Sequence, residues 1–469
     1  MPESIFATVV KRATYSSMGA LIGRVIMAVT GIILARAVGP AMFGVYAAIW
    51  ALMELSSAFT EIGVITGLKR EGARSPEMMS GLLGNAIGVK FVIGALFYAA
   101  ALACLPLVTK SPLAPALFVP LVLASFSTLC SEPFLAVLQI RGEQRIASAW
   151  TVSRGLAFLV GTGIAAYLGC SVVVLAWLQG LTYAVAGVLI TCVAVRRVSV
   201  KLNLSYLRKQ MKGAFVFGVS EILYSAYLRI PLLCLSHFGT EEDVGYFAVA
   251  LRFVTICVLA GAAANNEAFL PALFGLHKSN RGEFRRVCAL MQRLLLAGGI
   301  AASAALFACS EFLVIVLQGE EYRDAVRVLR TLCWSVALSY GSIAADAALT
   351  AGDRMRAKIV IQTCVTGGLL LLALVLTGKL GVMGSTYVTL WGCCATLALM
   401  VPYAYVRNMF PFAGLAGLVL PSVLTVAAAV VTVEVVSDQF LLGPLCFFGA
   451  AGLCWYPFLR KGITRGFAS

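Results

Sequence analysis

The chain has 469 residues, of which 61% are hydrophobic and 12% are charged, and its mean hydropathy is +0.94. Soluble domains are about 45–50% apolar, so this composition excludes a water-soluble protein. The formal net charge of +15 does not indicate a nucleic-acid partner, because the basic residues occupy positions that mark membrane topology.

Apolar stretches of about 20 residues or more follow one another along the chain, each long enough to cross a hydrocarbon core of roughly 30 Å as a helix. In chain order, the first seven predicted spans are 14–38, 43–67, 82–105, 114–138, 147–168, 171–195 and 214–238. The next seven are 244–270, 290–315, 325–348, 359–377, 381–406, 412–436 and 440–459. The predicted fold class is an all-α polytopic membrane protein with about fourteen transmembrane helices.

Basic residues gather in alternate connections between the predicted spans. Examples are Lys11 and Arg12 before the first span, Lys69 and Arg70 after the second, and residues 196–212 after the sixth. By the positive-inside rule these connections are cytoplasmic. We therefore predict a multi-pass protein of the bacterial inner (cytoplasmic) membrane with both termini in the cytoplasm, which requires an even number of spans.

Two weak internal similarities indicate a duplicated chain, with chance matching of glycine-centred turns as the alternative. Residues 39–47 resemble 239–248, and residues 142–145 resemble 352–355. Offsets of roughly 200 residues map the first six spans onto the next six in the same orientation, a plan found in transporters that bind substrate between two halves. The predicted parts are an N-lobe (1–195), a basic cytoplasmic linker (196–213), a C-lobe (214–406) and two C-terminal helices (407–469).

The motifs of common enzyme and metal sites are missing from the sequence. There is no GxxxxGK phosphate loop, no HExxH and no paired CxxC, and the histidines are His237 and His277 alone. The predicted outer loops are short, whereas a glycan polymerase or ligase would be expected to fold larger segments over its catalytic groups. We predict a protein that is not an enzyme, with no cofactor and no metal site; a membrane glycosyltransferase or polymerase is the alternative.

Charged residues inside the predicted spans are the main candidates for a functional site. Each costs roughly 3 kcal/mol at a span centre, so such residues normally face a partner or a wet cavity. Arg24, Arg229 and Arg252 lie at depths that predict convergence on one cavity, where a guanidinium binds phosphate oxygens with two hydrogen bonds. Lys90 and Arg36 are further cationic candidates, although Arg36 lies near a helix end, where snorkelling is the alternative.

Acidic residues inside the spans support two interpretations. Glu54, Glu61 and Glu221 are candidates for ion coupling, because buried carboxylates readily take up protons and could also bind a cation. The structural alternative is a set of internal salt bridges, Arg24 with Glu61 or Glu54 and Arg229 with Glu221. Glu221 and Arg229 belong to a polar stripe with a residue at every fourth position, which we expect to face the interior.

Short motifs spread over nearly the whole chain carry a resemblance to a known family. They are residues 33–40 (ILARAVGP) with 43–46 (FGVY), 244–246 (VGY) with Arg252, 319–322 (GEEY) and 351–353 (AGD). In this order and topology, the chain resembles the oligosaccharide repeat-unit flippases, the O-antigen and exopolysaccharide translocases of the MOP (multidrug/oligosaccharidyl-lipid/polysaccharide) exporter superfamily.

This resemblance implies translocation of undecaprenyl-pyrophosphate-linked oligosaccharide from the cytoplasmic to the outer leaflet, by alternating access between two six-helix lobes. The implied partners are the lipid-linked oligosaccharide, membrane lipids, H+ or Na+ as coupling ion, and the polymerase and glycosyltransferases of the same pathway. Two alternatives share the superfamily: a flippase for a lipid-linked peptidoglycan precursor, and a MATE-like drug or cation antiporter, which would rely more on carboxylates and aromatic residues.

Overall fold

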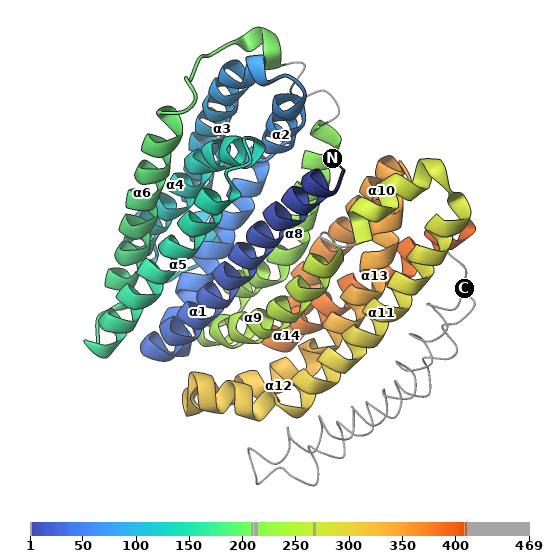
Figure 1. Ribbon diagram of the computed structural model, residues 1–469. Helices are drawn as coiled ribbons and strands as arrows, with labels where there is room; N and C mark the ends of the chain where they lie inside the picture. The colour runs from blue at the N-terminus through green and yellow to red at the C-terminus, as the bar shows by residue number, and fades with distance from the viewer. Residues whose placement is uncertain (1, 208–209, 211–213, 266–268, 408, 410–469) are drawn as a thin grey trace. The chain divides into compact units, whose positions relative to one another are not determined.

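The computed structural model describes residues 2–207, 210, 214–265, 269–407 and 409 (Figure 1). Within these ranges the regular structure is helical and no strand is formed. The chain divides into two compact units, Met1–Gly245 and Tyr246–Ser469, which are described separately. The predicted spans 412–436 and 440–459 lie outside the described residues.

The first unit is built from long helices connected by short turns. They are α1 (Pro2–Thr60), α2 (Val64–Arg74), α3 (Met79–Val108), α4 (Ala114–Ile140), α5 (Gln144–Tyr167), α6 (Val172–Val195) and α8 (Phe215–Phe238). Single turns of 3-10 helix occur at Pro76–Met78 and Leu204–Tyr206, and α9 (Glu241–Ala264) begins at the end of the unit. Among these α-helices, all except the short α2 contain a stretch that is long and apolar enough to cross a membrane.

Helix α1 contains the first predicted span and most of the second. Its helical conformation breaks at Gly39, where φ is 76° and ψ is 169°, a region that side chains with a Cβ rarely adopt. Pro40 follows and lacks the backbone N–H that would continue the ladder. The predicted end of the second span at residue 67 is wrong: α1 ends at Thr60, because Gly63 adopts a left-handed conformation (φ 76°) and α2 starts afresh at Val64.

Small residues allow the helices of the first unit to approach closely. Helix α4 packs along α6, where a Cβ on Gly180 would lie 2.6 Å from the carbonyl oxygen of Pro120. The second half of α1 meets the start of α9 in the same way. A Cβ on Gly44 would overlap the carbonyl oxygen of Glu241, and a Cβ on Gly245 would overlap that of Pro40. Glycine at these positions therefore lets two backbones touch.

The connection between α6 and α8 is attached to the first unit. Asn85 of α3 donates through Nδ2 to the carbonyl oxygen of Asn203 (2.6 Å) and accepts through Oδ1 from its backbone N–H (3.0 Å). The backbone N–H of Lys201 donates to the carbonyl oxygen of Ser80 (3.2 Å). Further along, Gln210 Nε2 donates to the carbonyl oxygen of Val64 (3.3 Å). The predicted cytoplasmic linker is therefore held along α2 and α3 rather than projecting freely.

The second unit contains most of α9 and the helices that follow. They are α10 (Leu270–Ser279), α11 (Arg281–Ala308), α12 (Arg323–Leu332), α13 (Trp334–Ala351) and α14 (Met355–Val406). A π-helical turn at Phe312–Val316 and a 3-10 turn at Glu320–Tyr322 connect α11 to α12. Helix α11 packs along α13, which in turn packs along α14.

A kink in α14 and the start of α11 each have a local cause. Helix α14 holds the predicted spans 359–377 and 381–406, and it kinks at Gly381 (φ 57°, ψ −133°). Helix α11 begins after Asn280, whose side chain accepts hydrogen bonds from the backbone N–H groups of Gly282 and Glu283 (both 3.1 Å). That cap satisfies two of the donors that a helix start leaves without partners.

The described residues include ten helices that are long and apolar enough to cross a membrane. Two of them, α1 and α14, each contain all or most of two predicted spans, one on either side of a glycine break. The predicted all-α polytopic fold class is confirmed, and the chain is a multi-pass membrane protein. The number of fourteen spans stays a prediction, because the last two lie outside the described residues.

Candidate functional site

An ion pair joins α8 to the second half of α1. Arg229 Nη2 lies 2.8 Å from Glu54 Oε2, and the two side chains are 27% and 33% exposed. The salt-bridge interpretation therefore names the right cation with the wrong partner: Arg229 pairs with Glu54, on another helix, rather than with Glu221. Glu221 lies two turns earlier on α8 and is exposed.

Arg24 is exposed in the first half of α1. Its neighbours Gly23 and Ile26 face α5, where a Cβ on Gly23 would lie 3.1 Å from Thr151, so they hold the helix while Arg24 points elsewhere. Arg24 forms no ion pair with any residue that the structure describes. The predicted alternative pairing of Arg24 with Glu61 or Glu54 is therefore wrong, because both carboxylates contact other cations.

Lys90 lies at the centre of a charged cluster inside the first unit. Its ammonium group is fully buried on α3 and donates to Oε1 of Glu61 and to Oε2 of Glu132. Glu61 follows the end of α1, and Glu132 comes from α4. One cation between two carboxylates satisfies the requirement that a buried charge be paired. Glu132 is not among the residues predicted from the sequence, although an acid inside the predicted span 114–138 is a signal for such a site.

Arg154 is a second charged residue inside the first unit that sequence analysis did not single out. Its guanidinium carbon lies 4.5 Å from the ring centre of Trp150 and 4.4 Å from that of Tyr183, so two aromatic faces hold it. Nη1 donates to the hydroxyl of Thr128 (3.4 Å), one turn before Glu132 on α4. The geometry makes Arg154 a bridge between α4, α5 and α6.

In the second unit, two motif residues far apart in the sequence, Tyr246 and Tyr322, lie in contact. The ring of Tyr322 lies 6.3 Å from that of Tyr246 in an edge-to-face contact, and Tyr322 is fully buried. Arg252, half-buried on α9, lies close enough to interact electrostatically with the Tyr322 hydroxyl. Tyr246 and Tyr322, from two of the motifs, are therefore neighbours, and Arg252 lies near them on α9.

Arg36 is exposed, three residues before the break at Gly39. It therefore lies close to the end of a span, as expected for a residue that snorkels. Together with Arg24 and Arg229 it gives the first unit several guanidinium groups that are at least partly exposed at its surface. Lys90 does not belong with them, because its side chain is enclosed by the two carboxylates.

The fold is similar to that of several solved transporters. A lipid II flippase, MurJ, in an inward closed conformation has a TM-score of 0.74 at 13% identity, over 96% of this chain and 99% of that one. An inward-facing MATE-family multidrug resistance transporter of the MOP superfamily has a TM-score of 0.66 at 15% identity, over 82% and 94% of the two chains. A MOP superfamily transporter from Pyrococcus furiosus gives 0.61 at 16% identity, over 85% and 95%.

These structures are of a flippase and of transporters rather than of enzymes, and the two transporters are described as members of the MOP superfamily. No curated protein sequence is similar enough to this chain to count as a match. The family model described as polysaccharide biosynthesis protein matches residues 9–277. The chain belongs to this polysaccharide biosynthesis family.

Proposed function

We propose that the protein is a flippase for undecaprenyl-pyrophosphate-linked oligosaccharide repeat units, which it moves from the cytoplasmic to the outer leaflet of the bacterial inner membrane. The product would feed O-antigen or exopolysaccharide synthesis by the polymerase and glycosyltransferases of the same pathway. The observation that carries this proposal is membership of a polysaccharide biosynthesis family combined with a fold shared with a lipid II flippase. Transport proceeds by alternating access between two lobes.

In this mechanism, Arg24, Arg229 and Arg252 bind the pyrophosphate headgroup. A pyrophosphate crossing the membrane needs cations, and a guanidinium fork matches phosphate oxygens with two hydrogen bonds. The exposure of Arg24 and the partial exposure of Arg229 and Arg252 support this role. Arg36 adds positive charge near a span end. Lys90 acts indirectly, by holding Glu61 and Glu132 in place.

The proposed moving lobes are residues 1–195 and 214–406, with 196–213 between them. Under this division, α8 belongs to the second lobe, and the Glu54–Arg229 ion pair connects the lobes. A phosphate that binds Arg229 competes with Glu54 for the same guanidinium. Substrate binding would then break this contact between the lobes and favour the change of access.

Glu54, Glu61 and Glu221 are the proposed groups for coupling to H+ or Na+. When phosphate takes Arg229, the Glu54–Arg229 ion pair breaks and Glu54 can bind H+ or Na+ in place of the guanidinium. The membrane potential also helps an anionic headgroup leave a negative interior, by roughly 2.3 kcal/mol per charge per 100 mV. The requirement for a coupling ion is therefore small.

A flippase for a lipid-linked peptidoglycan precursor is the second candidate, and the fold shared with MurJ favours it. Both cargoes carry the same lipid pyrophosphate, so the arginines serve either. Complementation separates them: a strain without its O-antigen or exopolysaccharide flippase regains surface polysaccharide only in the first case. A strain depleted of its peptidoglycan precursor flippase regains viability in the second.

The experiment that tests the arginine assignment is export of surface polysaccharide by single variants. We expect R24A, R229A and R252A each to abolish export while the protein still inserts in the membrane at the wild-type level. R196A, at the exposed end of α6, is the matched control and retains export. Full export by all three single variants would remove the assignment.

A further inference from the structure

The cluster around Lys90 contains two carboxyl groups and one ammonium group, so its charges do not balance if both acids are ionised. The ammonium contacts Oε1 of Glu61 and Oε2 of Glu132, and the two carboxyl groups also lie within hydrogen-bonding distance of one another. Two carboxylates this close repel each other unless a proton lies between them. With one proton, the cluster holds one acid, one carboxylate and one ammonium, and its net charge is zero.

Cations on the neighbouring helices leave this imbalance in place. Lys69 on α2 and Arg154 on α5 both interact electrostatically with Glu132. Lys69 is exposed, so solvent screens its charge. The Arg154 guanidinium is held by the rings of Trp150 and Tyr183, and no ion pair joins it to a carboxyl group among the residues that the structure describes. Neither cation therefore takes the place of a proton between the two acids.

Other titratable side chains beside the cluster carry no charge at neutral pH. Tyr98 on α3 and Cys130 on α4 lie close enough to interact electrostatically with it. Tyrosine and cysteine ionise only in the alkaline range. The three groups of the cluster itself therefore decide how many protons it holds.

The position of Lys90 makes the cluster selective for a proton over Na+. Its ammonium is fully buried and occupies the space between the two carboxyl groups, where a metal cation would bind. A Na+ ion would have to displace this ammonium or lie beside it, and two cations at close range repel each other. A proton needs no further space, because it lies on the line between two carboxyl oxygens.

The carboxyl groups are accessible although the ammonium is not. The side chains of Glu61 and Glu132 are 33% and 40% exposed, against 0% for Lys90. Glu61 also lies toward the end of the second predicted span, which the positive-inside rule places at the cytoplasmic side. In this conformation, a proton can therefore exchange between the cluster and the cytoplasmic side.

Glu61 also lies where a movement of α8 would alter the cluster. It directly follows α1, whereas Glu132 comes from α4. Two residues further along, Gly63 packs so closely against the residue before α8 that a Cβ on it would lie 2.2 Å from the carbonyl oxygen of Ala214. Separation of α8 from this turn would remove a contact that fixes the turn, and Glu61 could then move away from Glu132.

We propose that Glu61 and Glu132 hold one shared proton beside Lys90, and that this cluster couples transport to H+ rather than to Na+. The cluster retains the proton while α8 contacts the turn after α1 and releases it when this contact opens. Proton binding is a property of the first unit alone. Only the coupling step rests on the proposed function, which leaves the choice between the two ions open.

Infrared spectroscopy of the purified full chain in detergent tests for the proton. A protonated carboxyl group has a carbonyl stretching band that carboxylates lack, and the band shifts when D2O replaces H2O. We expect this band in the wild type at neutral pH. It should be lost in E61Q and in E132Q, because the remaining carboxylate then pairs with Lys90 and ionises.

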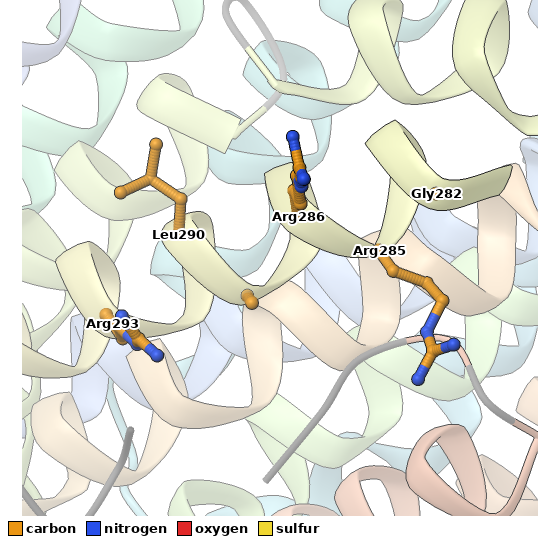
Figure 2. Close-up of a pocket in the computed structure, with 6 residues that line it drawn as sticks. Gly282, Arg285, Arg286, Leu290 and Arg293 are labelled. Carbon is orange, nitrogen blue, oxygen red and sulfur yellow. The ribbon is translucent and has the colours of Figure 1, made fainter. Parts of the chain in front are cut away.

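The matched control for these variants is E283Q, which makes the same chemical change at the protein surface. Glu283 lies on α11, one turn before Arg286 (Figure 2), and its side chain is 47% exposed. A carboxylate in such a place is ionised at neutral pH, so it contributes no band. E283Q should therefore keep the band of the wild type.

Three infrared results would overturn the proposal. A band of equal strength in the wild type, E61Q and E132Q would mean that the proton belongs to other acids. Loss of the band when Na+ replaces K+ at constant ionic strength would mean that Na+ displaces the proton. Absence of the band from the wild type would be decisive even if both variants fold poorly.

The coupling step is tested separately, in vesicles with the membrane potential held at zero. One coupled proton shifts the distribution of the lipid-linked cargo between the leaflets by up to about tenfold per unit of pH difference. We expect this shift with the wild type and E283Q, but not with E61Q or E132Q, and we expect no shift from a Na+ gradient. A wild type that moves the cargo but does not respond to the pH difference would contradict the coupling step. A wild type that moves no cargo would contradict the proposed function as well, whereas the infrared band does not depend on the cargo.

Discussion

Arg229 on α8 and Glu54 on α1, 175 positions apart in the sequence, form an ion pair with 2.8 Å between Nη2 and Oε2. Each side chain keeps about a third or less of its surface exposed, so the pair is neither sealed in a dry interior nor fully hydrated. Such a contact stabilises one arrangement of two helices and is still open to competition by another anion. The contribution of this ion pair to stability and the binding of a competing phosphate to Arg229 can be measured separately.

Exchanging the two residues of the Glu54–Arg229 ion pair distinguishes a role in stability from a role in transport. E54A removes the charged partner of Arg229 and should destabilise the protein by roughly 1.5–3 kcal/mol, the range for hydrogen bonds to charged groups. The exchange E54R/R229E restores an ion pair and should recover most of the lost thermal stability in detergent. It should not recover transport, because a carboxylate on α8 cannot bind phosphate. Recovery of transport by the exchange would show that Arg229 is only structural.

The cluster around Lys90 should be the most sensitive charged site for stability. K90M leaves Glu61 and Glu132 facing one another without a cation. Breaking a fully buried pair from one side costs about 3–5 kcal/mol, and the partial exposure of the two carboxylates (33% and 40%) places the cost here toward the lower end of that range. We expect a large fall in the melting temperature and in the amount of protein inserted. K110M at an exposed position is the control and should melt like the wild type. If K90M melts at the wild-type temperature, Lys90 does not hold these helices together.

The backbones of α1 and α9 are so close at Gly44 and Gly245 that adding one methyl group at either position should disrupt folding. G44A and G245A each place a Cβ against a carbonyl oxygen, and that oxygen belongs to the backbone and cannot move aside. We expect both variants to lose folded protein, measured by size-exclusion chromatography in detergent. G163A is the matched control: its Cβ would meet no atom within 4 Å, and alanine favours a helix. Equal yields of all three variants would contradict the contact.

The two hydrogen bonds between the Asn85 side chain on α3 and the Asn203 backbone attach the linker, so their loss should loosen the linker without unfolding the protein. N85A removes both hydrogen bonds to the Asn203 backbone, worth about 0.5–1.5 kcal/mol each. Trypsin should then cut after Lys201 several times faster, while the melting temperature changes little. N203A keeps the backbone groups that Asn85 binds and should be cut at nearly the wild-type rate. Equal cutting of N85A and the wild type would mean that the linker is held by other contacts.

The positions of most membrane-spanning helices could be predicted from hydropathy, because polar residues, glycine and proline lie close to the helix ends. The predicted span 114–138 corresponds to Ala114–Ile140, and 171–195 to Val172–Val195. Hydropathy does not report backbone conformation, so the left-handed turn at Gly63 was missed and one span was drawn too long. It also merged α12 and α13 into one predicted span, 325–348, because the apolar face of the amphipathic α12 continues into α13.

Partners of the charged residues could be predicted much less well. The free energy of placing a charged side chain in a membrane makes any charge inside a span a candidate, which is why Arg229, Lys90 and Glu61 were named. They do not identify which charges meet, since that depends on how helices distant in sequence pack. Glu132 and Arg154 lie in α4 and α5, and their roles became visible only through their contacts with Lys90 and with Trp150.

Flipping of a lipid-linked oligosaccharide can be measured in vesicles that contain only the purified protein and lipid. A fluorescent oligosaccharide on undecaprenyl pyrophosphate is placed in both leaflets, and a membrane-impermeant quencher reports how fast the inner pool becomes accessible. We expect rapid exposure with the wild type, tenfold to about 100-fold slower exposure with R24A, R229A or R252A, and none for a fluorescent phosphatidylcholine. Exposure no faster than in protein-free vesicles, or equal rates for all these variants and the wild type, would contradict the proposed function.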